Sequence, residues 1–433
     1  MSPLEHVELL LGRIERLDPE IGAFVQVFRE EALGSARLAE DAIRNGRPLG
    51  PLHGIPVAIK DNIDVAGAPT TCQSRVRAGA PVPSQDADVV TRLREAGAII
   101  LGKLALEEFA IGDQSSDAGF PVTRNPWDLL RTPGGSSCGA GAAVAAGFVP
   151  IAIGTDTGGS IRNPAALCGV VGLKPTHGCL PLGGVFPLAR SLDHAGVITR
   201  TVAENVLALR ALSGRPIQVE TKGIRGLRLG IVKHFYTEDV LSTPDVRDAI
   251  ETALEVLRSL GAAVRETRLD PLPLFRECGW TILKAEAYRV HERWLQERPQ
   301  DYGAAARRAL LAGACVDQDS YREAQRMRVW LRDNIATAMR DVDVLVTAVV
   351  AAPACRLTEG NAMEQSRDGS MRIPFNVTGN PAMSLPIGFN REGLPLAVQL
   401  VGRHGEESTL YRVALAYEAA TTWHQRRPAS VSL

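Results

Sequence analysis

The chain has 433 residues, 45% of them hydrophobic and 22% charged, which is the composition of an ordinary globular protein. Its 48 basic and 49 acidic residues nearly cancel. It therefore lacks the basic excess typical of nucleic-acid-binding proteins, and we expect no nucleic-acid partner. Seven scattered cysteines without a Cys-x-x-Cys pair argue against a disulfide framework and a zinc site, and favour the reducing cytoplasm. The apolar run at 139–154 is broken by glycines and a proline, so no membrane span is expected.

Two helices are predicted at the N-terminus. Leu9, Ile14 and Leu17 fall near one face of the first, whose acidic, amphipathic start differs from that of a secretory signal. The second is expected over residues 30–45 and ends at Gly46. An apolar strand at 55–59 then leads directly into Lys60.

Helices and strands alternate along the rest of the chain, which predicts an α/β fold with a large mixed β-sheet between α-helices. A helix over 244–261 has Val246, Ile250, Leu254 and Leu257 on one face, and Thr243 can cap it just before Pro244. The polar segment 356–372 is predicted to be a surface loop or lid. The other predicted helices span 86–96, 318–340 and 407–420, and the other strands span 98–101, 262–264, 342–347, 383–388 and 394–401.

Two glycine-rich turns carry serines in a pattern that indicates acyl transfer. Ser160 follows Gly158 and Gly159, whose flexible backbone can expose successive N–H groups, as an oxyanion hole requires. Ser136 also follows two glycines, and Lys60 ends an apolar strand, where a lysine is costly unless paired or neutral. A tight turn, a helix N-cap and a lysine that reaches water explain these features singly. Together they indicate a nucleophilic hydroxyl with an amine base.

These motifs closely resemble those of the amidase signature family of serine amidohydrolases. Ser136 and Ser160 stand 24 residues apart, as is usual in that family. The resemblance covers nearly the whole chain. The matching segments are residues 54–62, 124–128, 132–137, 154–162, 168–176, 191–193, 380–382 and 393–395.

The resemblance implies a Ser-cisSer-Lys triad, with Ser160 as nucleophile, Ser136 as bridging serine and Lys60 as general base. The cis peptide would join Gly135 to Ser136. Burial must then lower the pKa of Lys60 from about 10.4 so that the amine can accept a proton. No cofactor or metal is implied. The resemblance further assigns the oxyanion hole to the backbone N–H groups of Thr157, Gly158, Gly159 and Ser160, and support of the triad to Ser137, Thr155, Asp156 and Arg162.

The chain departs from the family pattern outside the triad. Cys138 stands where a glycine usually follows the two serines, and residues 177–179 (His-Gly-Cys) replace Tyr-Gly-Arg. Residues 112–117 and 119–122 differ from the glutamyl-tRNA amidotransferase version of that loop. The expected function is therefore hydrolysis of a carbon–nitrogen bond in a small, linear amide through a seryl acyl-enzyme. The alternative is the catalytic subunit of a multiprotein aminoacyl-tRNA amidotransferase.

Other site assignments are weaker. A Ser-His-Asp triad with His177 or His194 as base would lack the Gly-x-Ser-x-Gly elbow and leave Lys60 without a purpose. Cys138 or Cys168 as nucleophile is disfavoured because buried cysteines are mostly inert packing residues. A binding module on an inactive amidase scaffold conflicts with the intact triad.

We expect one amidase domain over residues 1–433, with the signature core at about 54–200 and the C-terminal part completing the same sheet. A small amide substrate is the expected partner, and a homodimer is left open. Specificity loops on a rigid scaffold are expected to bound the acyl pocket. The candidate segments are residues 112–121, 183–186 including Phe186, and 356–372.

Overall fold

The computed structural model describes residues 1–47, 49–114, 116–220, 222–357 and 370–431. The strands are β1 (Phe24–Val27), β2 (Pro56–Lys60), β3 (Ile99–Leu104), β4 (Ile151–Asp156), β5 (Val171–Lys174), β6 (His194–Thr199), β7 (Arg228–Ile231), β8 (Ala263–Glu266), β9 (Val344–Ala348), β10 (Ala382–Phe389) and β11 (Pro395–Val401). The helices are α1 (Pro3–Ile21), α2 (Arg29–Arg44), α3 (Asp88–Glu95), α4 (Cys138–Ala145), α5 (Arg162–Cys168), α6 (Val202–Ser213), α7 (His234–Thr237), α8 (Pro244–Ser259), α9 (Leu272–Glu297), α10 (Ala304–Leu311), α11 (Gln318–Ala338), α13 (Pro374–Val377) and α14 (Glu407–Ala419).

The strands form one mixed sheet in the order β1-β3-β2-β4-β6-β5-β10-β11-β9-β7-β8. β2 runs parallel to both of its neighbours, β3 and β4. From β4 to β9 adjacent strands are antiparallel, and β9, β7 and β8 are parallel again. The C-terminal hairpin of β10 and β11 therefore lies inside the sheet. The predicted α/β fold with a large mixed sheet is confirmed.

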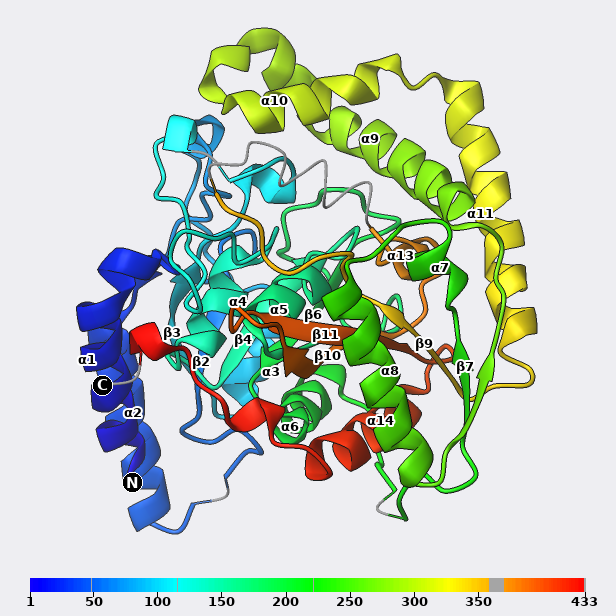
Figure 1. Cartoon of the computed structure of the whole chain (residues 1–433). Helices are drawn as coiled ribbons and strands as arrows, with labels where there is room; N and C mark the ends of the chain where they lie inside the picture. The colour runs from blue at the N-terminus through cyan, green and yellow to red at the C-terminus, as the bar shows by residue number, and fades with distance from the viewer. Residues whose placement is uncertain (48, 115, 221, 358–369, 432–433) are drawn as a thin grey trace.

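Helices cover both faces of the sheet because its central strands are apolar on both sides. Successive side chains of a strand point to opposite faces. Val57 and Ile59 of β2 belong to one buried cluster together with side chains of α3, α6 and α8, whereas Ala58 belongs to another with side chains of α1 and α4. Figure 1 shows α1 and α2 at the left, on the side of the sheet where β3 and β2 lie, with α9 and α10 above the sheet and α11 running down its right-hand side.

The helix α8 illustrates how closely periodicity predicts some elements. Its predicted stripe of Val246, Ile250, Leu254 and Leu257 is buried, and Pro244 is its first residue. The predicted cap is wrong in one respect. Thr243 occupies the N-cap position, but its side chain makes no capping hydrogen bond.

Two other parts of the structure differ from the prediction. Leu9, predicted to lie near the apolar face of α1, is 58% exposed. The buried stripe instead contains Leu10, Leu11 and Ile14. The longest helix, α9, is not predicted by the sequence pattern. It buries Ile282 and, on its opposite face, His291, so it carries no single apolar stripe for a periodicity argument to find.

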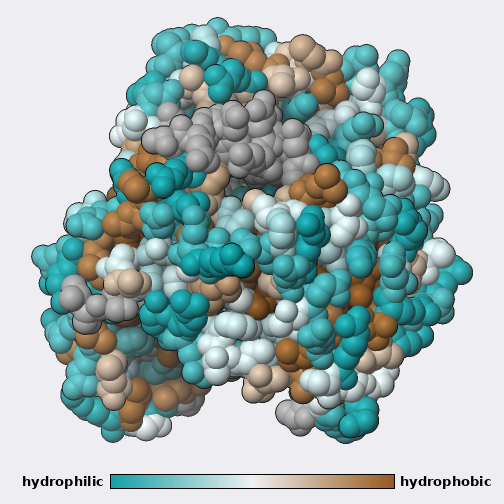
Figure 2. All heavy atoms as spheres, in the orientation of Figure 1, coloured by the Kyte–Doolittle hydropathy of each residue, from teal (hydrophilic) through white to brown (hydrophobic). Residues whose placement is uncertain are grey.

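The face seen in Figure 2 is largely hydrophilic, with apolar side chains in small, separate groups. Within the described residues, no helix combines the length and apolarity needed to cross a bilayer.

Candidate active site

Lys60 ends β2 in the interior of the sheet and is completely buried. Its Nζ lies 2.8 Å from Ser136 Oγ and 2.9 Å from Thr155 Oγ1. Thr155 Oγ1 also accepts a hydrogen bond from Asn62 Nδ2 at 3.1 Å. Burial lowers the pKa of Lys60 to about 8, and nearby acidic groups, Glu107 among them, oppose this decrease. The lysine can therefore exchange a proton close to neutral pH.

Ser136 and Ser137 lie immediately before α4. The peptide between Gly135 and Ser136 is cis, which confirms what the resemblance implies. Ser137 does not cap α4 with its side chain. Its Oγ donates to the carbonyl of Thr155 at 3.1 Å, and its N–H donates to the carbonyl of Ser160, also at 3.1 Å. These bonds place the two serine-bearing turns side by side at the end of β4.

Ser160 ends the turn between β4 and α5, is half-buried and lines a cavity. Within this turn, the N–H of Gly159 donates to Asp156 Oδ1 at 2.8 Å. That group is engaged inside the protein, unlike the free oxyanion donor that the resemblance implies. The N–H groups of Thr157, Gly158 and Ser160 donate to no protein acceptor within the described residues.

A buried ion pair between Asp156 and Arg162 underlies the turn, with Nη2 and Oδ1 2.9 Å apart. Both side chains are fully buried. Arg162 also donates to the carbonyl of Arg372 at 2.8 Å, to Asn376 Oδ1 at 2.6 Å and to Gln399 Oε1 at 2.7 Å. Burial alone would raise the pKa of Asp156, but the guanidinium of Arg162 holds it well below its usual range. The carboxylate is therefore ionised, and it holds the turn by accepting hydrogen bonds from the backbone N–H groups of Gly159 and Ile161.

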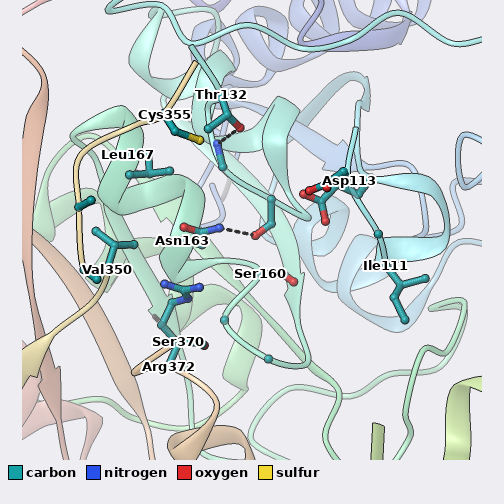
Figure 3. Close-up of a pocket in the computed structure, with 18 of the residues that line it drawn as sticks. Ile111, Asp113, Thr132, Ser160, Asn163, Leu167, Val350, Cys355, Ser370 and Arg372 are labelled. Carbon is teal, nitrogen blue, oxygen red and sulfur yellow. Dashed lines mark hydrogen bonds between the residues drawn. The ribbon is translucent and has the colours of Figure 1, made fainter. Parts of the chain in front are cut away.

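Ser160 faces a cavity of about 660 Å³. Figure 3 shows Asp113 and Arg372 on opposite sides of this cavity, with Ser160 between them. Asn163 Nδ2 donates to the carbonyl of Gly135 at 3.3 Å. This hydrogen bond links the start of α5, next to the Ser160 turn, to the turn that carries Ser136. The charged lining residues are Glu107, Asp113, Asp239, Arg276 and Arg372, and the larger apolar ones include Ile111, Leu167, Leu188, Leu241, Trp280, Leu283, Val350 and Leu357.

Only some of the segments predicted to bound the acyl pocket line the cavity. Residues 112–114 line the cavity, as do Leu357, Ser370 and Arg372 from the polar segment, of which residues 358–369 lie outside the described part. The prediction for residues 183–186 is wrong, since none of them is a lining residue. Phe186 packs instead against Phe109 and Trp294, with ring centroids 5.2 and 6.1 Å away.

The histidine and cysteine alternatives find no support in this geometry. Among the described lining residues there is no histidine. His194 is buried and packs edge-on against His177, with 5.1 Å between ring centroids. Burial raises the pKa of Cys138 to about 12 and that of Cys168 well above the usual value, so both remain thiols. The described residues bring together no group of three or more potential metal ligands.

Three residues at the site are not identified by the sequence patterns. Glu107 lies shortly after the strand β3. A carboxylate near the end of a strand is a sequence feature by which it could have been predicted as a site residue. Asn376 and Gln399 reach Arg162 from segments more than 200 residues further along the chain. Neither has a local motif that could reveal it.

The comparisons with known proteins agree with this geometry. A family model described as Amidase matches residues 5–411. Among the sequence relatives, a glutamyl-tRNA(Gln) amidotransferase subunit of Chloroflexus aurantiacus is 39% identical, over 99% of this chain and 95% of that protein.

Two solved structures extend the likeness to the fold. The peptide amidase of Stenotrophomonas maltophilia is 30% identical, with a TM-score of 0.83 over 99% of this chain and 95% of that one. A chain of a vestigial protein complex, described as revealing the evolutionary origins of an s-triazine catabolic enzyme, is 32% identical. Its TM-score is 0.90, over 97% of this chain and 95% of that one. The chain thus belongs to the amidase family, the amidase signature family that its motifs indicate.

Proposed function

We propose that this protein hydrolyses a carboxamide through a covalent acyl-enzyme on Ser160. The observation that carries the proposal is the contact of 2.8 Å between Lys60 Nζ and Ser136 Oγ, buried beside the Ser160 turn. A completely buried amine next to a hydroxyl is an arrangement suited to proton transfer, and the adjacent cavity offers room for a substrate.

In the proposed first step, Ser160 Oγ attacks the carbonyl carbon of the amide. Its proton passes to Ser136 Oγ, while the proton of Ser136 passes to the neutral Lys60 Nζ. With a pKa of about 8 for Lys60, about one molecule in ten carries the neutral amine at pH 7. The backbone N–H groups of Thr157, Gly158 and Ser160 are the proposed donors to the oxyanion, because they have no protein acceptor in the described part of the chain.

The tetrahedral intermediate then collapses. The carbon–nitrogen bond breaks, the proton returns through Ser136 to the leaving nitrogen, and Ser160 is left as an ester. Water then attacks the ester carbonyl, and its proton passes through Ser136 to Lys60. The bond between the carbonyl carbon and Ser160 Oγ breaks, Oγ takes the proton back along the same route, and the acid is released. Ser137, Thr155, Asp156 and Arg162 are proposed to support these steps, since they bond to the two turns and to Lys60.

The fate of the amide nitrogen defines two versions of this function. The sequence relatives favour the first: because they are named as parts of an amidotransferase, the nitrogen would be passed on to an acceptor with the help of partner proteins. The second is hydrolysis of a small amide by the chain alone, which the likeness to peptide amidase and the departures at Cys138 and residues 177–179 favour. All seven cysteines are free thiols, which supports a cytoplasmic location for either version.

The test is ammonia release by the purified chain from glutamine, asparagine, small aliphatic and aryl amides, and a peptide amide. Folded Ser160→Ala should be inactive, and Lys60→Ala nearly so, because Lys60 is the amine that bonds to Ser136. Ser136→Ala should retain more activity, since a water can replace part of the relay. Turnover by Ser160→Ala would overturn the proposal. Turnover only after reconstitution with proteins that copurify from the source cells would select the first version, and turnover by the chain alone the second.

A further inference from the structure

Two buried polar residues, Lys174 and His194, take no part in the proposed chemistry. Lys174 is 0% exposed and His194 is 3% exposed, and neither lines the cavity. Lys174 Nζ lies 2.6 Å from the carbonyl oxygen of Asn380, 3.0 Å from that of Pro175 and 3.1 Å from His194 Nε2. Three acceptors match the three protons of an ammonium group. Lys174 therefore holds one edge of the His194 ring in place.

The other edge of this ring faces the nucleophile turn. His194 Nδ1 lies 2.7 Å from the carbonyl oxygen of Leu192 and 3.2 Å from that of Asp156. Carbonyl oxygens only accept hydrogen bonds, so Nδ1 must carry the proton and donate it. In the antiparallel pair of β4 and β6, His194 is also the direct cross-strand partner of Asp156.

The carbonyl of Asp156 belongs to the same peptide as the N–H of Thr157. A trans peptide is planar, and its C=O and N–H point in opposite directions. His194 Nδ1 at 3.2 Å and Asn376 Nδ2 at 3.1 Å hold the carbonyl of Asp156 on their side. The same bonds therefore direct the N–H of Thr157 away from them.

The neighbouring residue Asp193 fixes the side chain of Thr157. Thr157 Oγ1 donates to Asp193 Oδ1 at 2.6 Å, and Asp193 accepts further bonds from the backbone N–H groups of Leu188 and Ala189. Two consecutive residues, Asp193 and His194, thus fix both the backbone and the side chain at Thr157. Such double fixation is what a preorganised oxyanion donor requires.

We propose that His194, braced by Lys174, is a positioning residue that presents the N–H of Thr157 to the oxyanion. This inference rests on the proposed function. An oxyanion donor acts mainly in the transition state, so its misalignment lowers kcat and leaves KM nearly unchanged. Loss of a complete donor costs about 100-fold to 1000-fold in kcat, and misalignment of one donor should cost at least about tenfold.

The test compares His194→Asn with His194→Gln. An asparagine amide nitrogen takes approximately the place of Nδ1 and can still donate to Asp156, whereas a glutamine amide nitrogen lies near the place of Nε2, toward Lys174. We expect His194→Asn to keep kcat within about threefold of wild type and His194→Gln to lose about tenfold or more, with KM within about twofold for both. His177→Ala is the control, because it removes a ring that packs on His194 without bonding to the turn.

A second readout is the affinity for a substrate-like aldehyde, whose adduct with Ser160 carries an oxyanion. It should fall in parallel with kcat in His194→Gln and not in His194→Asn. Equal kcat in the two variants, or a change in KM alone, would overturn the inference. Both variants replace the ring with an amide, so a shared folding defect appears in their melting curves and in a common loss of activity. That common loss would also count against the inference. If the wild type hydrolyses no amide, either alone or after reconstitution with copurifying proteins, or if Ser160→Ala stays active, the proposed function has failed instead.

Discussion

Raising the pH from 7 to 9 should increase kcat/KM about tenfold, because the neutral fraction of a lysine with a pKa of about 8 rises from about one tenth to about nine tenths. Above pH 9 the rate should level off. An ordinary lysine, with a pKa of about 10.4, would instead give a rise of about 100-fold that continues beyond pH 10. The two profiles differ in slope and in plateau, so initial rates at low substrate concentration between pH 6 and 10.5 distinguish them.

The influence of nearby charge on the pKa of Lys60 can be tested at Glu107. Its negative charge raises the pKa of Lys60 and so opposes the effect of burial. Glu107→Gln should therefore lower that pKa and move the rising limb of the profile to lower pH. Asp113→Asn is the matched control, since Asp113 lines the same cavity but is not among the charges that act most strongly on Lys60.

Three results would refute this reasoning. The first is a wild-type limb that follows an unperturbed lysine. The second is a shift of the Glu107→Gln limb to higher pH. The third is an equal shift in Asp113→Asn, which would mean that the general charge of the cavity, rather than the proximity of Glu107, sets the pKa of Lys60. Each variant should first be shown to fold by circular dichroism.

Further substitutions test packing and specificity. Asp156→Asn leaves the guanidinium of Arg162 buried without its counter-ion and should destabilise the protein by about 3–5 kcal/mol, measured by denaturant unfolding; a change below about 1 kcal/mol would contradict the buried pair. Trp280→Ala should change the ranking of amides by kcat/KM because Trp280 lines the cavity, whereas Phe186→Ala should leave the ranking intact. Gly139→Ala should lower the melting temperature, with a cost of about 1–3 kcal/mol, because the added Cβ would collide with the carbonyl oxygen of Ala23. An unchanged melting curve would argue against this close packing of α4.

Much of the fold is predictable where one face of an element is buried and the other is not. The stripe on α8 is such a case, and its predicted residues are the buried ones. The helix α9 has no such pattern because it packs on two sides, with Ile282 and His291 on opposite faces. The order of the strands is not predictable either. The insertion of β10 next to β5 depends on contacts between segments about 200 residues apart.

The same distinction applies to the site. Lys60, Ser136 and Ser160 stand in local patterns of glycine and apolar residues, so sequence reasoning can single them out. The prediction for Phe186 is wrong because its position after the motif says nothing about the direction of its ring, which packs on Trp294 of α9. The residues that hold the motif are ordinary polar residues, and only the folded arrangement gives them a role.

The C-terminal third of the chain is therefore part of the site, although it contributes none of the proposed triad. Arg162 obtains its acceptors beyond Asp156 from the carbonyl of Arg372, from Asn376 on α13 and from Gln399 on β11. Without these segments a fully buried guanidinium would keep one counter-ion and lose three hydrogen bonds, which burial makes costly. The same segments hold the carbonyl of Asp156 through Asn376 and brace Lys174 through the carbonyl of Asn380. The motif-rich region around residues 54–200 supplies the proposed reacting groups, and distant C-terminal segments bond to Asp156 and Arg162 on either side of the Ser160 turn.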